Sequence, residues 1–355
     1  MREIEFTDKI MQEDFRNFSA RSLPWEKLQN VTVLVTGATG LIGSTLVKTL
    51  AYCNSVGRSK IKILCVVRNH EKAAGIFKEA LPNEDIEFIV QDIAEPVSFD
   101  GEVDYIIHAA SVTSSKMFVT KPVETIMTAV NGTKNILDFA VEKKVKGFVY
   151  LSSMEVYGVF DGSGELKTES DYGLIDPLQV RSSYSESKRM VECLCKSYQS
   201  EKNVPVRIAR LVQTFGPGVE KSDNRVFAQF ARSVINKEDI ILHTKGETKR
   251  KYLYTIDAVY GILLLMLDGA DGEAYNVANP DSFVSIYDMA CLASQLDPTG
   301  KVKVKIEIED INKFGYAPML IMNLSTAKIE ALGWKASVGL KEAFERMIKS
   351  MTQND

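Results

Sequence analysis

The chain has 355 residues, of which 45% are hydrophobic, which is enough for one large domain or for two smaller domains with a shared interface. This composition excludes a disordered tail and a small disulfide-stapled protein. The formal net charge is −4, so no global positive field favours nucleic acid as a partner. No apolar run approaches the ~20 residues of a membrane span, and residues 1–8 are too charged for a signal peptide. We therefore expect a cytoplasmic protein that binds neither nucleic acid nor membrane.

Cysteine and histidine give no sign of a disulfide framework or a metal site. The 5 cysteines include no Cys-x-x-Cys pair, and no two of the 3 histidines have the i, i+4 spacing that places two ligands on one helical face. We expect no bound metal.

From residue 31 onward, short apolar runs rich in β-branched residues alternate with longer helical stretches. Continuous apolar runs are typical of parallel strands that are buried on both faces. Helices are expected over Leu41–Asn54, Val123–Lys143 and Tyr184–Lys202. The β-α-β-α order predicts an α/β, Rossmann-like doubly wound parallel sheet with helices on both faces. The expected strands are 31–36, 61–67, 86–90, 105–108, 147–151 and 206–211.

The alternation breaks after residue 211 at the turn-forming run Phe215-Gly216-Pro217-Gly218. A strand over 252–255, a helix over 258–267 and a strand over 274–277 are expected to return to the sheet. The sequence then divides into an N-terminal extension (1–30), an NAD(P)-binding Rossmann domain (31–212, with 252–279) and a smaller C-terminal substrate-binding lobe (213–251 and 280–355). The extension is either an arm packed on a surface or a partner subunit, or a loosely ordered segment. Its apolar residues are Phe15, Phe18, Leu23 and Trp25.

A glycine-rich turn follows the first strand and opens the first helix. Gly37 permits a tight turn, Gly40 lets the backbone approach a pyrophosphate, and Gly43 allows close packing of helix against strand. The helix N-terminus offers N–H groups to the anion. We predict that a dinucleotide binds here. The predicted contacts in this turn are Gly37, Thr39, Gly40, Leu41, Ile42 and Gly43.

The ends of the next three strands predict the remaining cofactor contacts. Arg68, at the end of the second strand, favours NADP over NAD because an arginine can pair with a 2′-phosphate; the alternative is that it stacks on adenine or faces solvent. Asp92 and Ile93 follow the third strand and are placed to meet the adenine, although a turn-capping role suits Asp92 nearly as well. Ala109 and Ala110 keep side chains small where the dinucleotide would lie.

Tyr184 and Lys188 lie four residues apart and therefore on one face of a helix. We expect the lysine charge to lower the pKa of the phenol, so that Tyr184 acts as an acid or base near neutrality. Tyr198 and Lys202 have the same spacing, but they lie toward the far edge of the sheet and are expected on a solvated face. Ser153, at the end of the fifth strand, is predicted to hold a substrate oxygen, and Ser152 to cap the backbone.

These residues resemble the extended short-chain dehydrogenase/reductase family, in particular its nucleotide-sugar epimerases, dehydratases and decarboxylases. The resemblance runs from about residue 31 to the C-terminus. In that family the tyrosine exchanges a proton with a sugar hydroxyl while hydride passes to the nicotinamide, and the lysine also holds the nicotinamide ribose. The matching motifs, in family order, are Thr36–Gly43, His108-Ala109-Ala110, Asn131–Asn135, the Ser153 segment, Tyr184–Lys188 and Phe215–Gly218.

The resemblance implies substrate contacts further along the chain. Arg250 matches the late arginine that binds the substrate's diphosphate, although Lys251 stands where the motif has an acidic residue. Asn224 and Arg225 border the nucleotide pocket in one interpretation, and form a helix cap and a surface charge in another. The family also implies a homodimer formed by the helices over 123–143 and 184–202.

The net reaction is left open by the residues after Ser153. Sugar 4,6-dehydratases have an Asp-Glu pair there, whereas this chain has Met154 and Glu155, and methionine cannot donate a proton. The favoured interpretation is an epimerase/dehydratase-type enzyme that oxidises a nucleotide sugar, at C4, with Glu155 as a candidate base. An NADPH-dependent reductase of a keto sugar is the main alternative. A decarboxylase that uses Glu155 near the leaving carboxylate and a non-catalytic dinucleotide-binding protein are weaker ones.

Overall fold

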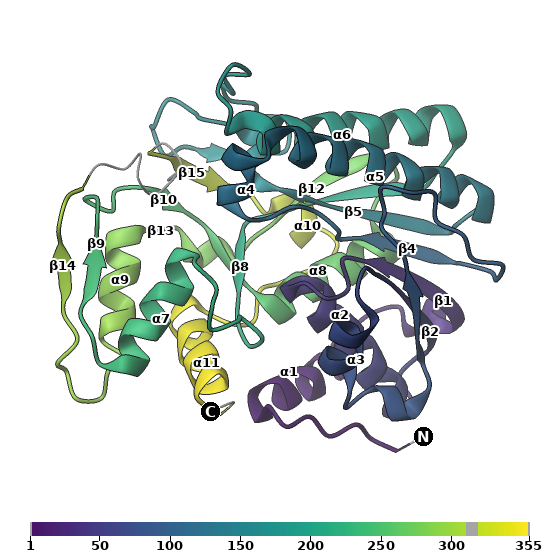
Figure 1. Ribbon diagram of the computed structural model, residues 1–355, viewed down its shortest axis with the longest axis horizontal. Coiled ribbons are helices and arrows are strands. Elements are labelled where there is room, and N and C mark those ends of the chain that lie inside the picture. Colours follow the sequence, from purple (N-terminus) through teal and green to yellow (C-terminus); the bar gives the residue numbers. More distant parts are fainter. Residues whose placement is uncertain (1, 310–318, 354–355) are drawn as a thin grey trace.

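The computed structural model describes residues 2–309 and 319–353. At its centre is a seven-stranded sheet with the order β12-β7-β5-β4-β1-β2-β3 (Figure 1). Every pairing in it is parallel. The structure therefore confirms the predicted Rossmann-like α/β fold. The strands are β1 (Gln29–Thr36), β2 (Lys60–Val67), β3 (Ile86–Val90), β4 (Tyr105–His108), β5 (Gly147–Ser153), β7 (Val206–Leu211) and β12 (Glu273–Val277).

Helices cover both faces of this sheet (Figure 1). One face carries α4 (Ser115–Thr120), α5 (Pro122–Lys143) and α6 (Ser182–Lys202). The opposite face carries α2 (Leu41–Ser55), α3 (His70–Phe77) and α8 (Thr255–Asp268). The buried apolar side chains accordingly form two clusters, one on each side of the sheet. The strand order reverses between β1 and β4, and this is where dinucleotides bind in open α/β sheets.

The N-terminal extension packs against its own chain. Its helix α1 (Lys9–Ser19) contacts α2, α8 and α11 (Leu340–Gln353), and Phe15 and Phe18 are fully buried. Asp14 accepts a hydrogen bond of 2.7 Å from Arg346 of α11. The short η1 helix (Trp25–Leu28) then leads into β1. The two ends of the described chain are therefore joined through buried apolar and charged contacts.

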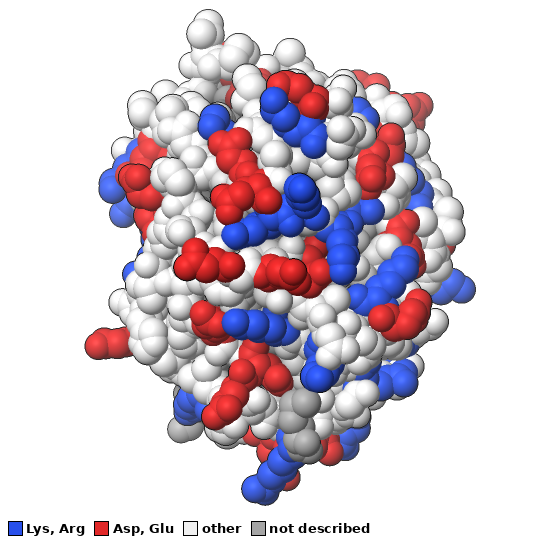
Figure 2. Space-filling model, turned by 90° about the vertical axis from the view of Figure 1, so that its right-hand side faces the viewer, with Lys and Arg blue, Asp and Glu red and all other residues white. Residues whose placement is uncertain are grey.

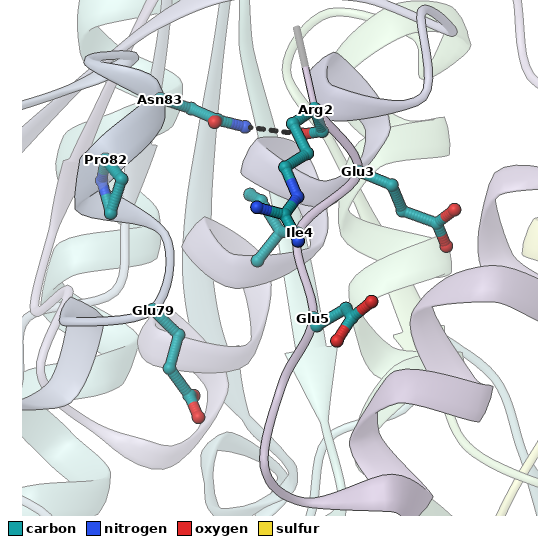
Figure 3. A pocket seen from close by; sticks show the side chains of 7 residues that line it. All are labelled: Arg2, Glu3, Ile4, Glu5, Glu79, Pro82 and Asn83. Carbon is teal, nitrogen blue, oxygen red and sulfur yellow. Dashed lines mark hydrogen bonds between the residues drawn. The ribbon is translucent and has the colours of Figure 1, made fainter.

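Residues 2–5 run beside the segment that follows α3, where the Asn83 side chain donates to the Arg2 carbonyl (3.3 Å; Figure 3). The loop between α3 and β3 contains the η2 turn (Leu81–Asn83). A pocket opens between the two segments, remote from the glycine turn. Its lining residues are Arg2, Glu3, Ile4, Glu5, Glu79, Pro82 and Asn83.

The strand predicted over 252–255 does not return to the central sheet, and that part of the prediction is wrong. β11 (Tyr252–Tyr254) pairs instead with β8 (Gln213–Phe215), which directly continues β7. The physical reason is that both edges of β7 are already occupied, by β5 and by β12. The helix and the strand predicted after it, α8 and β12, do lie in the central layers.

The remaining elements gather beside the carboxyl edge of the sheet (Figure 1). Parts of the predicted N-terminal extension and C-terminal lobe lie outside the described residues, namely Met1, 310–318 and 354–355. A four-stranded sheet contains β13 (Val284–Ser285), β10 (Lys249–Arg250), β15 (Ile321–Leu324) and β6 (Leu166–Lys167), and a two-stranded one contains β14 (Val304–Ile306) and β9 (Ile240–Leu242). The helices are η3 (Met154–Tyr157), α7 (Val226–Asn236), η4 (Pro280–Ser282), α9 (Ile286–Ser294), α10 (Ala327–Glu330) and α11.

The face shown in Figure 2 carries lysine, arginine, aspartate and glutamate side chains that are closely interspersed. Among the described residues, no helix combines the length and the apolar character needed to cross a bilayer. The same residues contain no group of three side chains that could hold a metal ion.

Candidate active site

The glycine turn is shaped by close backbone contacts. Gly37 has φ +65°, and a Cβ there would lie 2.6 Å from the Ala110 backbone nitrogen. A Cβ on Gly43 would lie 2.2 Å from the Gly37 carbonyl oxygen. Gly40 is the N-cap of α2 and no side chain caps this helix, which leaves its first N–H groups available to an anion. These residues fit the pyrophosphate of a dinucleotide, with Thr39, Leu41 and Ile42 in the same turn.

A buried histidine, which the sequence analysis did not single out as a site residue, ties this turn to the neighbouring strand and helix. His108 Nδ1 lies 2.7 Å from Thr36 Oγ1, and its Nε2 lies 3.0 Å from Thr133 Oγ1. Thr133 donates its hydroxyl to the Ala129 carbonyl, so it accepts from His108 Nε2–H, and Thr36 donates to Nδ1. Burial lowers the pKa of His108 to about 3, which keeps the ring neutral. Thr36 also accepts from the Ala110 backbone N–H.

The residues predicted to reach the adenosine lie at the ends of β2 and β3. Arg68 is exposed and forms no hydrogen bond or ion pair within the described part of the chain. Asp92 accepts from the Ala94 backbone N–H (2.9 Å), which is the turn-capping role weighed as its alternative. Ile93 is buried, and Asn135 donates to its carbonyl (3.0 Å). Contacts of these residues with a cofactor stay predictions.

Ser153, Tyr184 and Lys188 meet at the carboxyl end of β5. Ser153 accepts from the Glu155 backbone N–H (3.2 Å), and its hydroxyl lowers the pKa of the Tyr184 phenol. Tyr184 is 9% exposed and stacks on Phe118 of α4, with ring centroids 4.3 Å apart. The Lys188 ammonium donates to the Leu151 carbonyl (2.8 Å) and lies 5.7 Å from the centroid of the Tyr184 ring.

The expected effect of Lys188 on Tyr184 is not what the structure shows. Burial, which disfavours the charged phenolate, raises the pKa of Tyr184 above its usual value, and the charge of Glu155 raises it further. The Ser153 hydroxyl acts on the pKa of Tyr184 in the opposite direction. Burial also lowers the pKa of Lys188 to about 8. Desolvation of the buried phenol therefore determines the direction in which the pKa of Tyr184 shifts, and this direction is opposite to the one expected from the nearby Lys188 charge.

Glu155 forms an ion pair that the sequence did not reveal. Arg181 binds it through two hydrogen bonds, from Nη1 (2.8 Å) and from Nη2 (3.1 Å), and Ser185 donates to the same carboxylate (3.1 Å). The Arg181 guanidinium also lies 5.7 Å from the centroid of the Phe118 ring. Arg181 precedes Tyr184 by three residues, which is about one helical turn. This spacing is the feature of the sequence that indicates that Arg181 lies near Tyr184.

A second buried ion pair fixes α6 against the sheet. Arg210 of β7 donates to Glu192 through Nη2 (2.7 Å) and Nε (3.0 Å). Ser152 also donates its hydroxyl to Glu192, which corrects the predicted backbone-capping role of this serine. Because Glu192 follows Lys188 by four residues, its charge lies on the same helical face and raises the pKa of the ammonium against the effect of burial.

The other predicted substrate residues make local contacts of their own. Asn224 accepts from Gln229 through its carbonyl, and Arg225 pairs with Asp223 at the start of α7. Arg250 is half-buried, with its Nε 3.5 Å from the Tyr252 hydroxyl. No hydrogen bond or ion pair links these three residues to Tyr184 within the described ranges. Their contact with a substrate stays a prediction.

The second tyrosine–lysine pair, Tyr198 and Lys202, makes contacts that differ from those of Tyr184 and Lys188. Tyr198 donates its hydroxyl to Asp138 of the neighbouring helix α5 (2.5 Å). Lys202 pairs with the exposed Glu201 (2.8 Å). These contacts match the surface role expected for both residues.

Comparison with known proteins identifies the family. The family model described as "NAD dependent epimerase/dehydratase family" matches residues 33–278. The chain belongs to this family. It is an enzyme of the NAD-dependent epimerase/dehydratase type, which confirms the resemblance carried by the motifs.

Curated relatives of this family member include UDP-glucuronic acid decarboxylases. UDP-glucuronic acid decarboxylase 2 of Arabidopsis thaliana is 32% identical over 330 residues, which cover 92% of this chain and 69% of the relative. UDP-glucuronic acid decarboxylase 1 of Xenopus tropicalis is 31% identical over 319 residues, covering 89% and 71%.

Solved structures show the same fold. The epimerase Mth375 of Methanothermobacter thermautotrophicus superposes with a TM-score of 0.78 at 22% identity and covers 97% of this chain and 96% of its own. UDP-glucuronic acid 4-epimerase of Bacillus cereus in complex with NAD superposes with a TM-score of 0.71 at 20% identity, covering 91% and 97%.

The effect of the Glu192 charge on the pKa of Lys188 leads to a prediction. In Glu192→Gln the pKa of Lys188 falls below about 8, by about one pH unit, because the carboxylate that favours the ammonium is gone. NMR titration of protein labelled in the lysine ε-carbon measures this. Glu186→Gln, on the same helix, is the control and leaves the titration unchanged. An unshifted Lys188 in a folded Glu192→Gln protein would contradict the assignment.

Proposed function

We propose that this enzyme oxidises a nucleotide-linked hexuronic acid at C4 and releases its C6 carboxylate as carbon dioxide. The observation that carries the proposal is the likeness to UDP-glucuronic acid decarboxylases, at 31–32% identity over about nine-tenths of the chain. It moves the decarboxylase from a weak alternative to the favoured reaction. Met154, which cannot donate a proton, is buried where sugar dehydratases have an acid, and it disfavours water elimination.

The chemistry follows from the position of the ketone. NAD held at the glycine turn would supply an acceptor for the C4 hydride and a donor for its return. Tyr184 takes the proton of the C4 hydroxyl, and Ser153 donates a hydrogen bond to the same oxygen. The resulting 4-ketone is β to the C6 carboxylate, so the C5–C6 bond can break with its electron pair delocalised toward the C4 oxygen. Carbon dioxide leaves, and the enolate that remains takes a proton from water at C5. Tyr184 then gives its proton back to the C4 oxygen as hydride is restored to C4.

The ionisation states of the site fit these roles. Lys188, with a pKa of about 8, is mainly charged at neutral pH and lies beside the Tyr184 ring, where a positive charge favours the phenolate. The raised pKa of Tyr184 makes its phenolate a stronger base for the proton of the C4 hydroxyl. Arg250, Asn224 and Arg225 are proposed to hold the nucleotide diphosphate.

The reaction is tested by incubating the enzyme with NAD and UDP-glucuronic acid and following products by chromatography, which separates epimers, coupled to mass spectrometry. We expect a UDP-pentose that is lighter than the substrate by one carbon dioxide. Tyr184→Phe should lower turnover about 10²- to 10⁴-fold with an unchanged melting temperature, because it removes only a hydroxyl. Conversion to a UDP-hexuronic acid of unchanged mass would show a 4-epimerase and contradict decarboxylation.

For the cofactor, we propose that Arg68 makes the site accept NADP as well as NAD. Its exposed guanidinium lies at the end of β2, where the adenosine ribose sits in this fold. Arg68→Asp should weaken NADPH binding about 10- to 100-fold and leave NADH binding within about twofold, because it replaces a phosphate-binding charge by a repelling one. Fluorescence titration measures both, with Arg58→Asp as the control. An unchanged ratio would overturn this role.

For quaternary structure, we propose a homodimer formed through α5 and α6. The exposed apolar side chains of these two adjacent helices support it. Light scattering of the purified protein should give about twice the chain mass of 39.6 kDa. Met127→Glu should shift that mass toward the monomer, and a monomeric wild-type protein would contradict the dimer. The side chains are Val123, Ile126, Met127 and Val141 of α5 and Met190 of α6.

A further inference from the structure

Two opposite charges flank the catalytic tyrosine without belonging to the Ser153–Tyr184–Lys188 group. The Glu155 carboxylate and the Arg181 guanidinium form a two-bond ion pair, and their side chains are only 20% and 21% exposed. Both charges act on the ionisation of the Tyr184 phenol. Such a half-buried pair costs desolvation energy, so it is weak evidence for a purely stabilising role.

Arg181 has donors left over in this arrangement. Glu155 accepts from one N–H of each terminal nitrogen, and the buried Nε of Arg181 has no hydrogen-bond partner in the described chain. A guanidinium carries five N–H donors, so an incoming oxyanion can bind beside Glu155. Lys188, the other cation near the phenol, donates to the Leu151 carbonyl and lies over the Tyr150 ring.

The geometry of the substrate brings a carboxylate to this place. In a hexuronic acid the C6 carboxylate is bonded to C5, the neighbour of C4, so its oxygens lie a few bond lengths from the C4 oxygen. Tyr184 has to hydrogen-bond that C4 oxygen in order to exchange its proton. A carboxylate on C5 therefore comes within reach of the charges that surround the phenol, and a guanidinium is the group best suited to bind it.

We infer that the Arg181 guanidinium binds the C6 carboxylate of the substrate and selects acidic over neutral sugars. The inference rests on the proposed function. Glu155 holds the guanidinium in place through two hydrogen bonds, and its negative charge disfavours a second carboxylate beside it. Removing the charge of Glu155 alone therefore strengthens substrate binding, whereas removing Arg181 weakens it.

The test compares two variants by isothermal titration calorimetry. Glu155→Gln keeps the guanidinium, and the double variant Glu155→Gln/Arg181→Gln replaces the pair by two neutral amides, so no buried charge is left unpaired. UDP-glucuronic acid should bind the double variant about 10- to 100-fold more weakly than Glu155→Gln. UDP-xylose, which has no carboxylate, should bind both equally.

The other outcomes separate the two claims. Equal affinity of both variants for UDP-glucuronic acid would overturn the role of Arg181 and leave the proposed function standing. Loss of both ligands in the double variant would show that Arg181 shapes the site as a whole, and would overturn the carboxylate assignment. A wild-type protein that binds neither compound would overturn the proposed function and this inference with it.

Discussion

The parallel pairing of β1, β4 and β5 is the constraint on which the site depends. Their register places Thr36 beside His108, and His108 beside Tyr150. The residues that follow each strand therefore meet at one edge: Gly37 after β1, Ala109 and Ala110 after β4, and Ser153 at the end of β5. The glycine turn and the Ser153 hydroxyl come from distant parts of the sequence. The parallel register of the strands is enough to bring them to the same edge of the sheet.

Helix α6 brings the tyrosine and lysine to this edge, and buried charges hold the helix in position. Glu192 connects α6 to Arg210 of β7 and to Ser152 of β5. A buried ion pair of this kind stabilises little in itself, but losing one partner leaves an unpaired buried charge. The position of α6 is therefore tightly specified, and with it the place of Tyr184. The same carboxylate favours the charged form of Lys188.

The sequence was sufficient for the elements whose signals are local. Continuous apolar runs located β1 to β5, and Gly37 and Gly43 of the first turn are required by close approaches that leave no room for a side chain. Contacts across the fold left no such signal. Nothing in the pattern links Glu192 to Arg210 or Glu155 to Arg181, and the burial that raises the pKa of Tyr184 depends on Phe118 from another helix. The pairing of β11 with β8 likewise depended on the occupation of both edges of β7 by β5 and β12.

The central claim is that Tyr184 and the nicotinamide act together on C4 of the sugar. UDP-glucuronic acid deuterated at C4 tests it under single-turnover conditions with NAD. The account predicts that the labelled substrate reacts more slowly than the unlabelled one, and that the deuterium is found at C4 of the product after hydride return. Equal rates, or loss of the deuterium to water, would contradict it.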